Sequence, residues 1–168
     1  MSLFPADMLE QAAVIIDLCR ARRLTLATAE SCTGGLISGC FTEIAGASDV
    51  FERGFVTYSN RAKEEMLGVD PQTLARFGAV SKETALEMAR GALLRAGADI
   101  AIAVTGIASP GGGSAGKPVG LVHLAVEAKG RQALHRECQF GEIGRGEIRM
   151  QTLREALSMT DDVLQTAA

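Results

Sequence analysis

The run IAIAVT, residues 100–105, is the feature of this sequence that most limits the fold. It is almost entirely apolar and lies between Gly97, which closes a helical pattern, and a glycine-rich loop. Such a run is typical of a strand that is buried on both of its faces. A strand of this kind needs helices above and below its sheet, so the sequence predicts a layered α/β protein.

The other elements follow from hydrophobic spacing and from capping residues. Asn60 is expected to cap one helix and Ser81 another, whereas Gly68 and Pro71 are expected to end the first of these. Helices are predicted over residues 9–23, 36–44, 61–67, 81–96 and 147–164, and further strands over 24–29, 51–59, 121–128 and 132–140. This order predicts a three-layer α/β/α sandwich around a mostly parallel sheet, in one domain that spans residues 1–168. The hairpin at 121–140 requires at least one antiparallel strand.

Composition excludes several classes of protein. The chain has 168 residues, 47% of them apolar and 22% charged, which is ordinary for a globular protein. A net charge of −3, without a basic run, gives no indication of a nucleic-acid or membrane surface. We expect no signal peptide, because the N-terminus lacks a basic start followed by an apolar block, and no membrane span, because no long apolar run occurs. The cysteines lack any metal-binding spacing, so we expect no metal site and a reduced, cytoplasmic protein; they are Cys19, Cys32, Cys40 and Cys138.

Three polar loops are expected at one edge of the sheet. They carry Ser31, Tyr58 and the segment after Thr105, and each follows a predicted strand. Open α/β sheets bind ligands at the carboxyl ends of their strands. We therefore expect the site at this edge.

Ser31 lies in ATAESCTGG, between a strand and a helix. It can serve as a helix cap, or it can be a nucleophile beside the free amides of a helix start, which are the ingredients of an oxyanion hole. The stretch matches neither a GxSxG nucleophile elbow nor a P-loop. His123 and His135 both fall in strand patterns, where packing or surface roles are favoured. A Ser-His-Asp triad is therefore not expected.

The segment YSNRAK, residues 58–63, offers a different base. Lys63 can accept a proton near neutral pH if it is shielded from water, and Tyr58 can assist. The alternative is a solvated lysine beside two glutamates and a strand-end aromatic in water. The loop TGIASPGGGSAGKPVG has backbone amides that can form an anion nest, with Lys117 and the hydroxyls of Ser109 or Ser114 as further polar groups. It can also be a plain surface connection.

Five motifs in order extend the interpretation: ATAESCTGG, GASDVFERGFVTYSNRAKEEMLGV, GAVS, TGIASPGGG and KPVG. From about Leu9 to Leu164 the chain resembles the CinA C-terminal domain family, in particular the stand-alone nicotinamide-nucleotide amidohydrolases of the PncC type. The resemblance implies an anticodon-binding-domain-like sandwich whose five-stranded sheet has one antiparallel strand. It also implies deamidation of nicotinamide mononucleotide, in pyridine-nucleotide recycling, by a homodimer or larger homo-oligomer.

The same resemblance supplies the roles of the site residues. Ser31 matches the nucleophile, Tyr58 and Lys63 match its partners, and no metal or cofactor is needed. Our own hypothesis adds that amides from residues 32–34 hold the oxyanion, and that the glycine loop and Arg145 position ribose and phosphate. The expected substrate-binding residues are Glu30, Cys32, Thr33, Gly34, Gly35, Thr105, Gly106, Gly111, Gly112, Gly113 and Arg145.

Two positions depart from the family pattern. Ser109 replaces a glycine, and FGEIGR at 140–145 lacks the family's aspartate and has one residue more. The second departure motivates an alternative, a nucleotide-binding or accessory protein of the same family that has lost turnover. A third possibility is hydrolysis of another amide, with Cys32 as a rival nucleophile.

Overall fold

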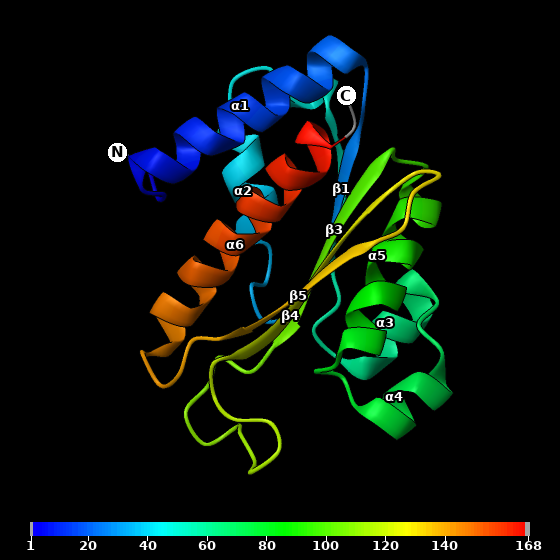
Figure 1. Ribbon diagram of the computed structural model, residues 1–168, viewed down its shortest axis with the longest axis vertical. Helices are drawn as coiled ribbons and strands as arrows, with labels where there is room; N and C mark the ends of the chain where they lie inside the picture. The colour runs from blue at the N-terminus through cyan, green and yellow to red at the C-terminus, as the bar shows by residue number, and fades with distance from the viewer. Residues whose placement is uncertain (1, 167–168) are drawn as a thin grey trace.

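A five-stranded sheet runs through the middle of the molecule, with helices on both of its faces (Figure 1). The computed structural model describes residues 2–166. The strand order is β2-β1-β3-β4-β5, with β1 parallel to β2 and β3, and β4 antiparallel to β3 and β5. Only β4 runs opposite to the others, so the predicted sheet is confirmed. The strands are β1 Leu26–Glu30, β2 Phe51–Val56, β3 Ile100–Gly106, β4 Leu121–Ala128 and β5 Leu134–Gln139.

The helices form two layers, as Figure 1 shows: α1, α2 and α6 cover one face of the sheet, and α3, α4 and α5 cover the other. This arrangement confirms the predicted α/β/α sandwich. Within the described residues the helices are α1 Ala6–Arg22, α2 Leu36–Thr42, the short 3-10 helix η1 Ala47–Asp49, α3 Asn60–Leu67, α4 Pro71–Phe77, α5 Lys82–Ala96 and α6 Arg145–Gln165.

Strand β3 is buried on both faces, as its sequence predicted. Ile100, Ile102 and Val104 pack into the core below α1 and α6, whereas Ala101 and Ala103 face α5. The small residues on the second face let α5 lie close to the sheet. The two faces of one strand therefore support both helical layers.

The structure corrects some boundaries. Helix α4 was not predicted, because Pro71 was taken only as the end of the preceding helix. Pro71 is instead the first residue of α4, where a missing N–H costs little, and the Asp70 carboxylate caps this helix by accepting a hydrogen bond from the Gln72 amide at 2.8 Å. Ser59, not Asn60, caps α3, and β2 ends at Val56. No helix within residues 2–166 combines the length and apolarity that crossing a membrane demands.

Candidate active site

Ser31 and Lys63 meet at the carboxyl edge of the sheet. Ser31 follows β1 directly, and Lys63 lies in the first half of α3. The Lys63 Nζ donates hydrogen bonds to Ser31 Oγ at 3.0 Å and to the Thr57 carbonyl at 2.8 Å. Lys63 is only 1% exposed although its side chain is one of the largest in the core. The two residues are therefore in direct contact and shielded from bulk water.

Burial changes the acidity of this lysine. It lowers the pKa of Lys63 from 10.5 to about 8, because removal from water disfavours the ammonium form. Lys63 makes no ion pair with a carboxylate anywhere in residues 2–166, and the neighbouring Cys32 thiol opposes the effect of burial only in part. About a tenth of the molecules then carry a neutral amine at pH 7. The neutral amine has a lone pair that can accept the Ser31 proton.

A tight turn follows the serine. The Ser31 amide donates to the Val104 carbonyl at 3.1 Å, and the Gly34 amide donates to the Ser31 carbonyl at 3.0 Å. The Gly34 amide was predicted to help hold an oxyanion, but this bond already occupies it. The amides of Cys32 and Thr33 donate to no acceptor among the described residues. These two are the amides left for an oxyanion near Ser31.

The Glu30 carboxylate points away from the cavity, toward the start of α2. Its carboxylate is fully buried and accepts hydrogen bonds from the amides of Gly35 and Ile37, both at 3.1 Å, and from the amide and hydroxyl of Ser38, both at 2.8 Å. We predicted a contact with substrate. Successive side chains of a strand point to opposite faces, so Glu30 faces α2 while Ser31 faces α3. Glu30 holds the start of α2 in place, and with it the turn.

A cavity of about 250 Å³ opens beside Ser31 and Lys63. The three predicted loops converge on it, and the connection between α4 and α5 adds a fourth wall. Its lining residues are Ser31, Cys32, Tyr58, Lys63, Ala79, Val80, Thr105, Gly106, Ile107, Ala108, Ser109, Gly112 and Arg145. Ala79, Val80, Ile107 and Ala108 make part of the lining apolar, which suits a flat ring, whereas Arg145 supplies positive charge.

Tyr58 and Arg145 lie together in the cavity lining. Tyr58 is 61% exposed, and its hydroxyl accepts a hydrogen bond from the Arg145 guanidinium at 2.9 Å. Arg145 also donates to the Ser109 hydroxyl. In residues 2–166, no hydrogen bond joins the tyrosine hydroxyl to Ser31 or Lys63. Assistance to the base by Tyr58 stays a prediction.

Several predicted binding residues are not among the residues that line the cavity. Thr33 and Gly34 lie in the turn after Ser31, Gly35 precedes α2, and Gly111 and Gly113 are exposed parts of the loop. Thr105 lines the cavity and also supports it, because its hydroxyl donates to the Ala79 carbonyl at 2.7 Å. The sequence interpretation missed four apolar lining residues, although GAVS and GIAS contain all of them: Ala79, Val80, Ile107 and Ala108.

Cys32 was considered as a rival nucleophile. Burial raises the pKa of its thiol to about 11, so the thiolate is scarce at neutral pH. Its side chain packs into the core below α2 and α6. These features favour packing for Cys32. Across residues 2–166 there is no group of three or more acidic, histidine or cysteine side chains that could hold a metal ion.

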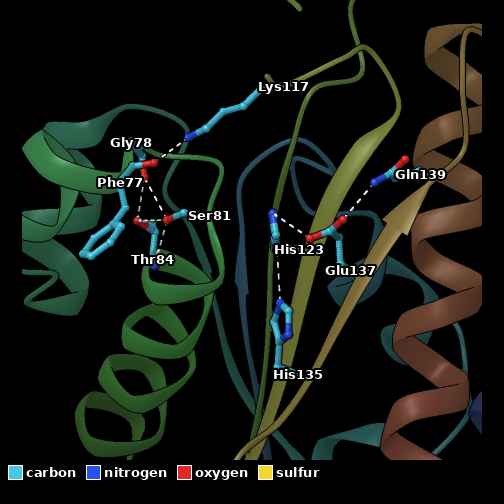
Figure 2. A network of polar contacts seen from close by, with 9 residues as sticks. All are labelled: Phe77, Gly78, Ser81, Thr84, Lys117, His123, His135, Glu137 and Gln139. Carbon is cyan, nitrogen blue, oxygen red and sulfur yellow. Dashed lines mark hydrogen bonds and ion pairs between the residues drawn. The ribbon is translucent and has the colours of Figure 1, made fainter. Parts of the chain in front are cut away.

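The two histidines form a separate cluster on the sheet face below α5 (Figure 2). His123 Nδ1 and His135 Nε2 are 3.0 Å apart, and His123 Nε2 lies 4.0 Å from a Glu137 carboxylate oxygen. Lys117, considered as a further polar group of the glycine loop, reaches the Phe77 carbonyl at the end of α4. His123 and Lys117 line a different cavity, of about 330 Å³. Neither histidine lines the cavity at Ser31, as expected.

Comparison with known proteins places the chain in a family. It is 47% identical to nicotinamide-nucleotide amidohydrolase PncC of Escherichia coli K12 over 153 residues, covering 90% of this chain and 92% of that protein. It is 49% identical over 128 residues to a CinA-like protein of Kosmotoga olearia, matching 76% of this chain and 31% of that protein. The chain thus spans about a third of the length of such longer relatives.

Solved structures agree. The crystal structure of competence/damage inducible protein CihA from Agrobacterium tumefaciens superposes with a TM-score of 0.95, at 59% identity, covering 98% of this chain and 99% of that one. A CinA superfamily protein from Escherichia coli gives a TM-score of 0.86 at 35% identity, covering 94% of this chain and 91% of that one. The model of the CinA C-terminal domain matches residues 9–164, and the chain therefore belongs to the CinA C-terminal domain family.

Proposed function

We propose that this protein is an amidohydrolase that converts nicotinamide mononucleotide to nicotinic acid mononucleotide and ammonia. The observation that carries the proposal is the 3.0 Å contact between the buried Lys63 Nζ and Ser31 Oγ at the wall of a cavity. A nucleophile, a base and an oxyanion site are the parts that amide hydrolysis through an acyl-enzyme requires. The similarity to PncC over nearly the whole chain supports the choice of substrate.

The first half of the reaction forms an acyl-enzyme. Ser31 Oγ attacks the carboxamide carbon and transfers its proton to the neutral Lys63 Nζ. The carbonyl oxygen becomes an oxyanion, which the free amides of Cys32 and Thr33 stabilise. The C–N bond then breaks, the ammonium of Lys63 returns the proton to the leaving nitrogen, and ammonia departs.

The second half releases the acid. A water molecule gives one proton to the neutral Lys63 and attacks the ester carbon. The bond to Ser31 Oγ breaks, and the serine oxygen takes the proton back from Lys63. Lys63 thus acts as base in one direction and as acid in the other. The 2.8 Å bond to the Thr57 carbonyl keeps Nζ in place throughout.

The nucleotide end of the substrate has two candidate partners. Arg145 is half-buried at the cavity and makes no ion pair with any carboxylate in residues 2–166, so its charge is available to a phosphate. The glycine loop adds backbone at Gly106 and Gly112. The altered FGEIGR segment still supplies this arginine, as the first residue of α6. That placement favours an active enzyme over an impaired one.

Ammonia release tests the proposal. Purified protein incubated with nicotinamide mononucleotide should give one ammonia per nicotinic acid mononucleotide formed. Ser31→Ala should remove the activity while leaving the circular dichroism spectrum and melting temperature close to those of the unaltered protein. Substrate binding without ammonia would favour the accessory-protein alternative, and an active, folded Ser31→Ala variant would remove the serine mechanism.

A further inference from the structure

Arg149 holds the turn that follows the serine. It lies one helical turn beyond Arg145 on α6 and is half-buried. Its Nε donates to the Cys32 carbonyl at 3.1 Å, and one terminal nitrogen donates to the Thr33 carbonyl at 2.9 Å. The planar guanidinium thus hydrogen-bonds to two consecutive peptide groups at once. These peptide groups lie on either side of Thr33.

The position of this charge is unusual. Arg149 makes no ion pair with a carboxylate in residues 2–166. The carbonyls that it contacts precede α2, and a cation near the start of a helix is electrostatically unfavourable. Arg131 provides a contrast, because it also donates to two carbonyls, those of Val163 and Thr166, both at 3.2 Å. That pair lies at the end of α6, where a cation stabilises a helix.

We infer that Arg149 is a positioning residue for the oxyanion site, an inference that rests on the proposed function. In a trans peptide the N–H and the C=O point in opposite directions. Fixing the Cys32 carbonyl therefore fixes the direction of the Thr33 N–H, one of the two free amides near Ser31. A cation on the carbonyl also polarises the peptide group, which makes its N–H a stronger donor. Arg149 acts through the Thr33 amide and touches no reacting atom.

The matched variants are Arg149→Met and Arg131→Met, each of which removes a guanidinium from two carbonyls. Arg149→Met should lower kcat by about tenfold or more with KM changed by less than about twofold, because oxyanion contacts act in the transition state. Arg131→Met should leave both constants unchanged and lower only the melting temperature. Arg149→Lys should lose about threefold in kcat, because lysine keeps the charge but cannot donate to both carbonyls in the fixed planar geometry of a guanidinium. Added guanidinium ion should restore part of the kcat of Arg149→Met.

A substrate-independent probe separates this inference from the proposed function. A fluorophosphonate reacts with an activated serine and needs the same oxyanion donors. Its rate of labelling at Ser31 should fall about tenfold in Arg149→Met and stay unchanged in Arg131→Met. This result, without ammonia from nicotinamide mononucleotide in the unaltered protein, would refute the substrate and support the role of Arg149. Equal kcat and equal labelling in both variants, or a loss confined to KM, would overturn that role. If Arg149→Met does not fold, Arg149→Lys decides by the same two readouts.

Discussion

Two contacting pairs of polar side chains, one buried at Ser31 and one partly buried at His123, differ in what surrounds them. Ser31 and Lys63 are 3.0 Å apart, and so are His123 and His135. Burial is the largest cause that lowers the pKa of Lys63 and of both histidines. Distance and burial alone therefore do not distinguish a reactive pair from a structural one.

The groups next to each pair make the difference. Two neutral imidazoles satisfy each other, since one donates and the other accepts, and a glutamate lies within 4.0 Å of His123. The lysine pair joins a potential base to a nucleophile, with two unbonded amides in the next residues. Chemistry at Ser31 is possible because a nucleophile, a base and unbonded backbone amides lie together beside one cavity. The predictions below test this contrast.

The largest expected effect comes from removing the two bases in turn. Lys63→Met should lower kcat/KM for ammonia release by about 10³-fold, because serine then has no base. His123→Gln should stay within about threefold of the unaltered protein, since the imidazole lies in another cavity. Both values are measured at pH 8.5 on purified, folded variants. A loss in His123→Gln as large as that in Lys63→Met would erase the contrast between the pairs.

The same two variants should change stability in opposite directions. The folded pKa of Lys63, about 8, lies below its unfolded value of 10.5, so below pH 8 the folded state carries a buried ammonium at a cost of about 3 kcal/mol. This cost falls between pH 8 and 10.5 and is absent above. Lys63→Met removes this cost of about 3 kcal/mol but also loses two hydrogen bonds. On balance it should raise the free energy of unfolding at pH 7 by about 2 kcal/mol.

Urea unfolding at pH 7 and pH 10 measures both changes. The gain from Lys63→Met should shrink at pH 10, where the unaltered protein no longer bears the charge. His123→Gln should instead lose about 1 kcal/mol at pH 7, because it breaks a partly buried hydrogen bond. A Lys63→Met variant that is less stable at both pH values would mean that the lysine contributes to stability.

The sequence predicted the sheet and its functional edge because these depend on local patterns. The two-faced burial of IAIAVT required two helical layers, and the polar residues after each parallel strand had to meet at one edge. Lys63 was identified because it follows a strand end by a few residues. Helix α4 was missed although Asp70 and Pro71 are typical of a helix start, since the same proline also suits a helix end.

The remaining site residues depend on contacts that no local pattern contains. Glu30 was grouped with Ser31 because they are adjacent, but alternation along the strand sends them to opposite faces. Arg149 reaches the turn from a helix more than a hundred residues away in the chain. Its position four residues after Arg145 on an expected helix was a signal for two arginines on one side, although not for their partners.

The change of kcat/KM with pH is the smallest expected effect, and it tests most directly whether Lys63 or a histidine accepts the proton of Ser31. If neutral Lys63 is the base, kcat/KM should rise with pH to a plateau, with a midpoint near the Lys63 pKa of about 8. The rise from pH 7 to the plateau should be about tenfold, since about a tenth of the amines are neutral at pH 7. The pKa values of both histidines are lowered, so their titration falls below this range and His123→Gln should leave the midpoint unchanged. Activity that is already maximal at pH 7 in both proteins would mean that the proton goes to a group other than Lys63.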